Sequence, residues 1–206
     1  MSGNKPVRLY MEGDTVVLEV RVYLDIRTED VPLAREMALA GLRRAGDMSP
    51  YQCGGRDISI RVDVEETDGF SLDAVNLRVY DITPVVRWRL SPKYNVSHAF
   101  LGAARPGLGK LIRRAAGVPD ISINLGGRDI HTERGMTLMQ TVVMHEFMHV
   151  ISFMDKYRGK KGKKLRRSVQ DRDIMYRTGG SQRLMEYHVK RLADCAKKGK
   201  LPIRWV

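Results

Sequence analysis

The sequence predicts an α+β fold in which a mixed, twisted sheet comes first and two long helices follow. Over the first 130 residues, several segments have hydrophobic residues at a period of two, and helical patterns alternate with them. Beyond residue 130 the period changes to that of helices, over 137–154 and again over 181–198. With 206 residues, 43% of them hydrophobic, the chain is long enough for one domain with a substantial core.

The elements of the first part are predicted from local signals. Val16, Leu18, Val20 and Val22 would lie on one face of a strand over 15–26. A helix follows, because the Asp-Val-Pro sequence at 30–32 is typical of an N-cap with an early proline, and a glycine at position 46 is placed to end it. Further strands are predicted over 58–64, 77–82, 85–90 and 119–125, and a short helix over 110–116.

Capping signals mark the later helices. Thr137 and Gln140 form a capping box that predicts the start of an apolar helix ending near Met154. Ser181 predicts the start of the last helix, and Gly199 its end. The organisation predicted from these elements is an N-terminal extension over 1–14 and a single domain over 15–206, with an upper lobe over 15–154 and a lower lobe over 155–206.

The charge of the chain is concentrated in one place. Lys and Arg number 36 and Asp and Glu number 24, which gives a net charge of +12. Eight of these basic residues and no acidic residue lie between Lys156 and Arg167. A solvated surface loop is the simplest interpretation of this stretch. The alternative is an electropositive surface that contacts an acidic substrate, nucleic acid or another polyanion.

Composition and hydropathy exclude other classes of protein. Cys53 and Cys195 lack the C-x-x-C spacing of cysteine-only zinc sites and cannot form a disulfide framework, so free thiols are expected. No apolar run is long enough for a signal-peptide core or a membrane span. We therefore expect a soluble protein, cytoplasmic in the first place, with leaderless secretion or association with a virion as alternatives.

His145, Glu146 and His149 form the pattern His-Glu-x-x-His inside the predicted helix over 137–154. Residues four apart differ by about 40° around a helix, so both imidazoles can bind one metal ion, and Zn2+ suits such a site. Glu146 lies one position round, where it can reach a metal-bound water as a general base without being a ligand. The neighbouring residues are apolar, and burying this group among them without a partner would cost several kcal/mol.

A third protein ligand is expected, and the first candidate is Asp155, ten residues after His145. The extended pattern His-Glu-x-x-His-x-x-Ser-x-x-Asp resembles the zinc-binding consensus of the metzincin clan of zincin metallopeptidases. It is most similar to the snapalysin family, in which aspartate is the third ligand. Metzincins usually have glycine at the position of Ser152, where the helix ends sharply. If the helix continued past Ser152, the third ligand could instead be Glu186 or His188 on the last helix, as in gluzincins.

A second motif adds to the resemblance. The segment Asp173-Ile174-Met175-Tyr176 is similar to the Met-turn, in which metzincins place a methionine beneath the zinc ligands. Met175 would accordingly pack under the site and not bind the metal. The resemblance implies a metzincin-like fold with an active-site helix, a Met-turn and a C-terminal helix. It also implies that residues 120–125 form an edge strand that binds an extended substrate by main-chain pairing.

The function implied by the resemblance is that of a zinc metalloendopeptidase acting on peptide or protein substrates. His145, His149 and Asp155 would hold Zn2+, and Glu146 would take a proton from the attacking water and return it to the departing amine. The alternative is a basic structural or polyanion-binding protein of zincin fold, such as a viral or phage component, whose metal site is vestigial or structural.

Overall fold

The computed structural model describes residues 5–82, 97–100, 103–104, 108–153, 173–175 and 182–202, apart from the side chain of Arg114. The predicted strand over 85–90, the ligand candidate Asp155 and the basic stretch 156–167 lie outside these ranges. The described part is an α+β fold with a mixed seven-stranded sheet and four helices. The helices are α1 (Val31–Asp47), α3 (Leu108–Ala115), α4 (Glu133–Val150) and α6 (Glu186–Ala196).

The sheet combines parallel and antiparallel strands in the order β3-β4-β2-β5-β7-β6. The central strands β4, β2, β5 and β7 are parallel, whereas β3 and β6 are antiparallel to their neighbours. β1 pairs antiparallel with the first half of β2, and β5 pairs with the second half. The strands are β1 (Val7–Glu12), β2 (Thr15–Arg27), β3 (Tyr51–Cys53), β4 (Arg56–Glu66), β5 (Val75–Tyr80), β6 (His98–Ala99) and β7 (Ile121–Asn124).

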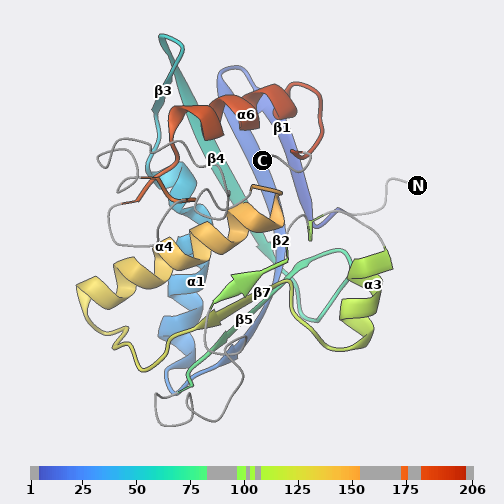
Figure 1. Ribbon diagram of the computed structural model, residues 1–206, viewed down its shortest axis with the longest axis vertical. Coiled ribbons are helices and arrows are strands. Elements are labelled where there is room, and N and C mark those ends of the chain that lie inside the picture. The colour runs from blue at the N-terminus through green and yellow to red at the C-terminus, as the bar shows by residue number, and fades with distance from the viewer. Residues whose placement is uncertain are drawn as a thin grey trace, which may run out of the picture.

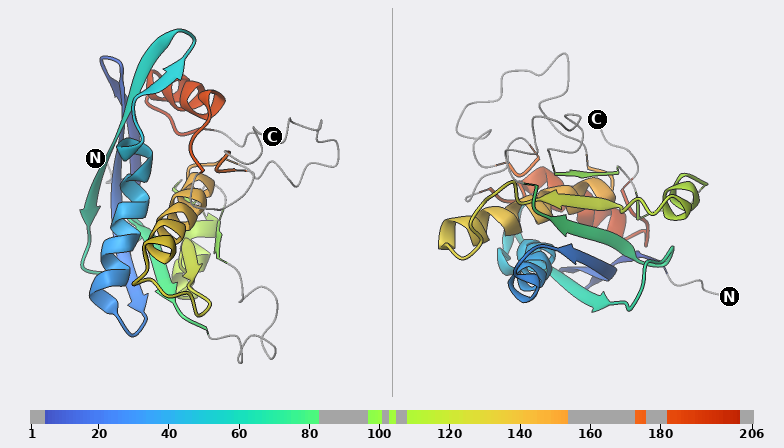
Figure 2. Two further views of the ribbon diagram at one scale, coloured as in Figure 1. Left: turned by 90° about the vertical axis from the view of Figure 1, so that its left-hand side faces the viewer. Right: turned by 90° about the horizontal axis from the view of Figure 1, so that it is seen from below.

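Helices α1, α4 and α6 lie on one side of the sheet, as Figure 1 and the left view of Figure 2 show. The alternating apolar residues of β2 are buried in the core, and Val16, Leu18, Val20 and Val22 are at most 1% exposed. α1 packs against both α4 and the strands β2 and β4. The core therefore lies between the sheet and these helices, and α4 runs through it.

Most predicted elements of the first part are confirmed with shifted ends. The strands predicted over 15–26, 58–64, 77–82 and 119–125 correspond to β2, β4, β5 and β7, and the helix over 110–116 to α3. The strands β1, β3 and β6 have no counterpart among the predicted elements. Since β1 lies within the predicted extension 1–14 and pairs with β2, that segment belongs to the sheet. Both cysteines are free, as expected.

The start of α4 differs from the prediction. Its N-cap is Thr132, whose hydroxyl oxygen accepts a hydrogen bond from the Gly135 amide at 3.1 Å. The predicted start at Thr137 is therefore wrong, and Thr137 lies inside the helix. Gly135 permits the earlier start, because a Cβ there would lie only 1.9 Å from the carbonyl oxygen of Asp129. α6 is also shorter than the predicted helix over 181–198.

β7 is not the open edge strand that the resemblance implied for residues 120–125. β5 pairs with one side of β7, and β6 pairs with the first part of the other side. Beyond these pairs, the Phe100 amide donates to the Asp120 carbonyl at 3.0 Å and the Asn124 amide donates to the Ser97 hydroxyl oxygen at 3.1 Å. These bonds occupy the outer edge of β7, so the expectation is wrong. β6 is the outermost described strand at this end of the sheet.

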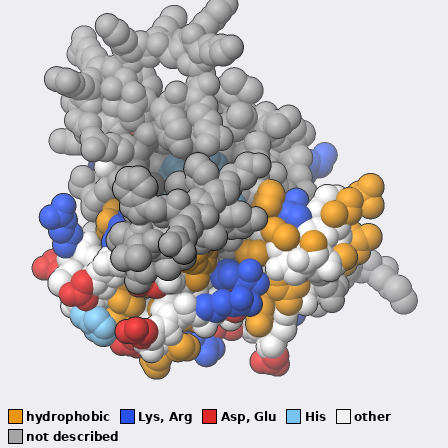
Figure 3. Space-filling model, turned by 60° about the horizontal axis from the view of Figure 1, so that its bottom comes forward, with side chains coloured by type: hydrophobic (Ala, Val, Ile, Leu, Met, Phe, Trp, Pro, Cys, Tyr) orange, Lys and Arg blue, Asp and Glu red, His pale blue; other side chains and the backbone are white. Residues whose placement is uncertain are grey.

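α3 lies at one side of the molecule, apart from the other helices (Figure 1). Its Lys110 is 4% exposed, donates to the Ala74 carbonyl at 2.8 Å and lies 3.5 Å from the Asp120 carboxylate. Burial lowers the pKa of Lys110, and the charge of Asp120 opposes this shift. Leu108 and Ile112 of α3 remain exposed, and hydrophobic side chains gather over this helix in Figure 3. Within the described ranges, no helix is long and apolar enough to cross a membrane.

α1 and α4 approach each other closely at Gly41. A Cβ atom at this position would lie 2.6 Å from the Cβ of Val143 and 2.9 Å from the carbonyl oxygen of Gln140. These distances leave no room for a methyl group unless one of the two helices moves. The helix that carries the His-Glu-x-x-His residues is thus held against α1 by a contact that only glycine permits.

We predict that Gly41→Ala lowers the free energy of unfolding by about 1–3 kcal/mol, because the added methyl group overpacks the contact between α1 and α4. Urea denaturation of the purified proteins measures this change. Gly69→Ala is the matched control, because a Cβ at Gly69 meets no atom within 4 Å. The control should change the free energy by no more than about 0.5 kcal/mol. Equal effects of the two substitutions would contradict the close contact at Gly41.

Candidate metal centre

α4 carries the polar residues of the motif through the core. All residues from 141 to 148 are buried, and the exposed fractions of His145 and Glu146 are 5% and 6%. A helix that is buried all round gives its polar side chains no access to bulk water. His145 and Glu146 must therefore find partners inside the protein.

The two imidazoles of the motif face each other across one turn of α4. The Nε2 atoms of His145 and His149 are 3.2 Å apart, and the ring planes are nearly perpendicular at 85°. Each Nδ1 atom lies against a main-chain carbonyl oxygen, that of Ile174 for His145 at 2.6 Å and that of Phe153 for His149 at 2.8 Å. A carbonyl oxygen only accepts hydrogen bonds, so these contacts assign a proton to Nδ1 in both rings.

This assignment leaves two acceptor atoms opposed. A neutral imidazole with its proton on Nδ1 has a lone pair on Nε2, and the two lone pairs of His145 and His149 meet at 3.2 Å. Such a pair is repulsive unless a metal ion or a proton lies between the nitrogens. Two nitrogens bound to one tetrahedral zinc ion at about 2.0–2.1 Å would be about 3.3–3.4 Å apart. The distance between the two Nε2 atoms thus fits a shared zinc ion.

Glu146 belongs to the same group. His145, Glu146 and His149 each offer one ligand atom, and these atoms lie within 4.8 Å of one another, so the group could hold a metal ion. A buried carboxylate at this distance favours a cation beside it, because opposite charges attract strongly where water is excluded. The structure therefore brings together the three motif residues predicted from their spacing.

The end of α4 sets the position of the ring of His149. Ser152 has a φ of +82°, the left-handed conformation that glycine adopts most easily. The Ser152 amide donates to the His149 carbonyl and the Phe153 amide donates to the Met148 carbonyl, both at 2.9 Å. The helix therefore does not continue past Ser152. The same turn directs the Phe153 carbonyl to Nδ1 of His149.

The segment 173–175 contacts the other imidazole. Its Ile174 carbonyl accepts the hydrogen bond from Nδ1 of His145. Met175, which was expected to pack under the site, has no exposed surface and belongs to the hydrophobic core that includes α4. Asp173 forms a parallel bridge with Arg183, which precedes α6. This short segment therefore connects α6 to the metal-binding motif on α4.

The third ligand stays a prediction, since Asp155 lies outside the described residues. The carboxylate of Glu186, an alternative ligand, accepts a hydrogen bond from the Gly54 amide at 2.8 Å. The other alternative, His188, accepts a main-chain hydrogen bond at the start of α6 through Nδ1, and its Nε2 lies 3.7 Å from Asp173. Among the described residues, the metal-binding group contains neither alternative.

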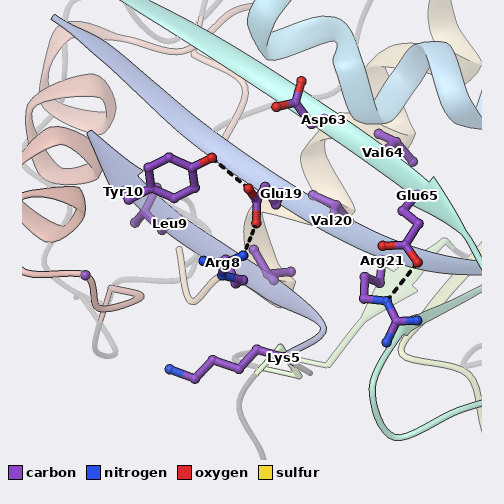
Figure 4. Close-up of a pocket in the computed structure, with 12 residues that line it drawn as sticks. Lys5, Arg8, Leu9, Tyr10, Glu19, Val20, Arg21, Asp63, Val64 and Glu65 are labelled. Carbon is purple, nitrogen blue, oxygen red and sulfur yellow. Dashed lines mark hydrogen bonds and ion pairs between the residues drawn. The ribbon is translucent and has the colours of Figure 1, made fainter. Parts of the chain in front are cut away.

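A hollow of about 790 Å³ lies away from the motif, over β1, β2 and β4 (Figure 4). Four of its charged side chains pair with one another. Arg8 and the Tyr10 hydroxyl both donate to Glu19 at 2.7 Å, and Arg21 donates to Glu65 at 3.2 Å. Such mutual pairing is typical of a solvated sheet surface. None of the three motif residues lines this hollow.

The groups that orient the imidazoles are not predicted by the motifs. Ile174 and Phe153 act through main-chain carbonyl oxygens, which every residue carries, so the side chains give no signal. Asp173 does carry a signal, because a carboxylate next to an apolar turn requires internal hydrogen-bond partners. Tyr187, which supplies one of those partners, is recognised only in the structure.

Comparisons with known proteins give one distant likeness. No family model and no curated protein matches the sequence. A solved structure described as the structure of myroilysin aligns with a TM-score of 0.45 and 13% sequence identity, over 85% of this chain and 91% of that chain. A likeness of this degree concerns the course of the chain alone.

We predict that Ser152→Gly raises the free energy of unfolding by about 0.5–1 kcal/mol, because glycine adopts the left-handed conformation without the cost that serine bears. Thermal and urea denaturation of the metal-free protein measure this change. Ser152→Ala is the matched control, since it removes the hydroxyl group and keeps the Cβ atom. The control should show no stabilisation, and an equal gain in both variants would contradict backbone strain at Ser152.

Proposed function

We propose that the chain is a zinc-dependent metallopeptidase. The observation that supports this proposal most strongly is the pair of Nε2 lone pairs of His145 and His149, opposed at 3.2 Å. The Glu146 carboxylate lies in the same buried group. The sequence pattern adds Asp155 as the third ligand, by its resemblance to the snapalysin family of metzincins.

Each residue of the site has one role in the proposed reaction. Zn2+ held by His145, His149 and Asp155 would supply a Lewis acid that activates water and polarises a peptide carbonyl. The Nδ1 hydrogen bonds hold both Nε2 lone pairs toward the metal position. Glu146 accepts the proton of the attacking water and delivers it to the departing amine. Met175 packs beneath the rings in the Met-turn proposed for this segment.

The composition of the site favours a catalytic role over a structural one. A structural zinc site is usually closed by four protein ligands, whereas a catalytic site keeps one position open. Two imidazoles and the carboxylate of Asp155 would leave such a position. Glu146 then serves as a base beside it, a group for which a purely structural site has no use.

We predict that Glu146→Gln lowers the rate of peptide hydrolysis by about 10²–10⁴-fold or more, because the glutamine cannot accept a proton, while zinc remains bound. Casein hydrolysis measures the rate, and atomic emission measures zinc per chain. The control is Glu133→Gln, which changes an exposed glutamate in the first turn of the same helix and should leave both values unchanged. Full hydrolysis by Glu146→Gln would refute the assigned role, and loss of zinc would make Glu146 a ligand.

A second candidate function is binding of a polyanion, and the observation that favours it is the cluster of basic residues over 156–167. In a peptidase the same charge would attract acidic substrates. If polyanion binding is the function, the protein should be retained on heparin in a salt-dependent manner, and exchanging the six Lys and Arg residues over 160–167 for Gln should abolish retention. Glu146→Gln should leave retention unchanged. Retention that survives the charge exchange would exclude this stretch as the contact.

A further inference from the structure

Asp173 is a buried carboxylate outside the metal-binding motif. It has no exposed surface, and it lies at the start of the segment whose next residue contacts His145. Its Oδ1 atom accepts a hydrogen bond from the Met175 amide at 2.9 Å, which closes the turn over 173–175. A buried carboxylate needs more than one donor, and the Tyr187 hydroxyl of α6 supplies another.

α6 holds the second oxygen of this carboxylate. The Tyr187 hydroxyl donates to Oδ2 of Asp173, and Nε2 of His188 lies 3.7 Å from Oδ1. Burial raises the pKa of Tyr187, and the hydrogen bond to Asp173 raises it further, so the phenol stays a donor. The main chain adds a second link, because the Ile174 amide donates to the Arg183 carbonyl at 3.1 Å.

The turn held in this way carries the acceptor for His145. Ile174 lies between Asp173 and Met175, the two residues joined by the hydrogen bond that closes the turn. Its carbonyl oxygen lies 2.6 Å from Nδ1 of His145. If the turn moved, the Ile174 carbonyl would leave the ring, and the proton on Nδ1 would lose the partner that keeps it there. The Nε2 lone pair would then no longer be fixed toward His149.

We propose that Asp173 is a positioning residue, which together with Tyr187 holds the Ile174 carbonyl against His145 and so fixes the tautomer and orientation of this metal ligand. The proposal rests on the metal site of the proposed function and not on peptide hydrolysis. Asp173 acts through the turn and touches neither substrate nor metal. It extends the functional unit from α4 to α6.

The test measures zinc affinity by competition with a chromophoric chelator, and the tautomer of His145 by nitrogen-15 NMR of the metal-free protein. Asp173→Ala should weaken zinc binding by about 10-fold or more and reduce the fraction of His145 protonated at Nδ1. Asp173→Asn keeps an acceptor for the Met175 amide and should restore most of the affinity. Tyr187→Phe removes one hydrogen bond and should weaken zinc binding by about 3–10-fold.

The matched control is Tyr10→Phe. Tyr10 is also half-buried and donates to a carboxylate, but it lies on β1 and its acceptor is Glu19, which is not a residue of the turn. This control should leave zinc affinity and the His145 tautomer unchanged. The proposal is overturned if a folded Asp173→Ala protein binds zinc as the unaltered chain does. If Asp173→Ala does not fold, unchanged affinity in Tyr187→Phe overturns it instead.

The outcomes separate this inference from the proposed function. An unaltered chain that binds zinc without cleaving peptides would refute peptidase activity, while the affinity series would still decide the role of Asp173. An unaltered chain that binds no zinc would refute the proposed function. In that case the NMR measurement tests whether Asp173 positions His145. An unchanged His145 tautomer in both Asp173→Ala and Tyr187→Phe overturns the proposal.

Discussion

The structure of the site depends on two hydrogen bonds from imidazole Nδ1 atoms to main-chain carbonyl oxygens. One bond joins His145 to Ile174 at 2.6 Å, and the other joins His149 to Phe153 at 2.8 Å. Because a carbonyl cannot donate, both rings present a lone pair at Nε2, and the helix spacing brings these lone pairs to 3.2 Å. The arrangement is unfavourable without a cation and well suited to one. The capacity of this group to hold a metal ion thus depends on main-chain positions as much as on the motif.

Both carbonyls are placed by backbone that departs from regular structure. The Phe153 carbonyl reaches His149 because α4 ends at Ser152, whose φ of +82° is unfavourable for a residue with a side chain. The Ile174 carbonyl lies in a buried turn closed by Asp173. Other elements hold both pieces of backbone in place. α1 packs against α4 at Gly41, and α6 contacts Asp173 in the turn through Tyr187.

Much of the fold could be predicted from the sequence, because several elements combine a regular hydrophobic pattern with turn or capping residues at their ends. These elements are β2, β4, β5, β7 and α1. The short strands β3 and β6 could not, since strands of three and two residues form only where a partner strand offers its edge. Thr137 and Gln140 matched a capping box, but Thr132 caps α4 instead. The His-Glu-x-x-His spacing predicted the three residues that lie together and could hold a metal ion, whereas the carbonyls that orient the imidazoles carry no sequence signature.

The most direct test of this account is the zinc content of the purified chain after exposure to zinc and exhaustive dialysis. The opposed imidazoles of His145 and His149 predict about one zinc ion per chain, and exchange of either histidine for alanine should remove it. A chain that retains no zinc under these conditions would contradict the account. The same conclusion would follow if both alanine variants kept the full amount of zinc.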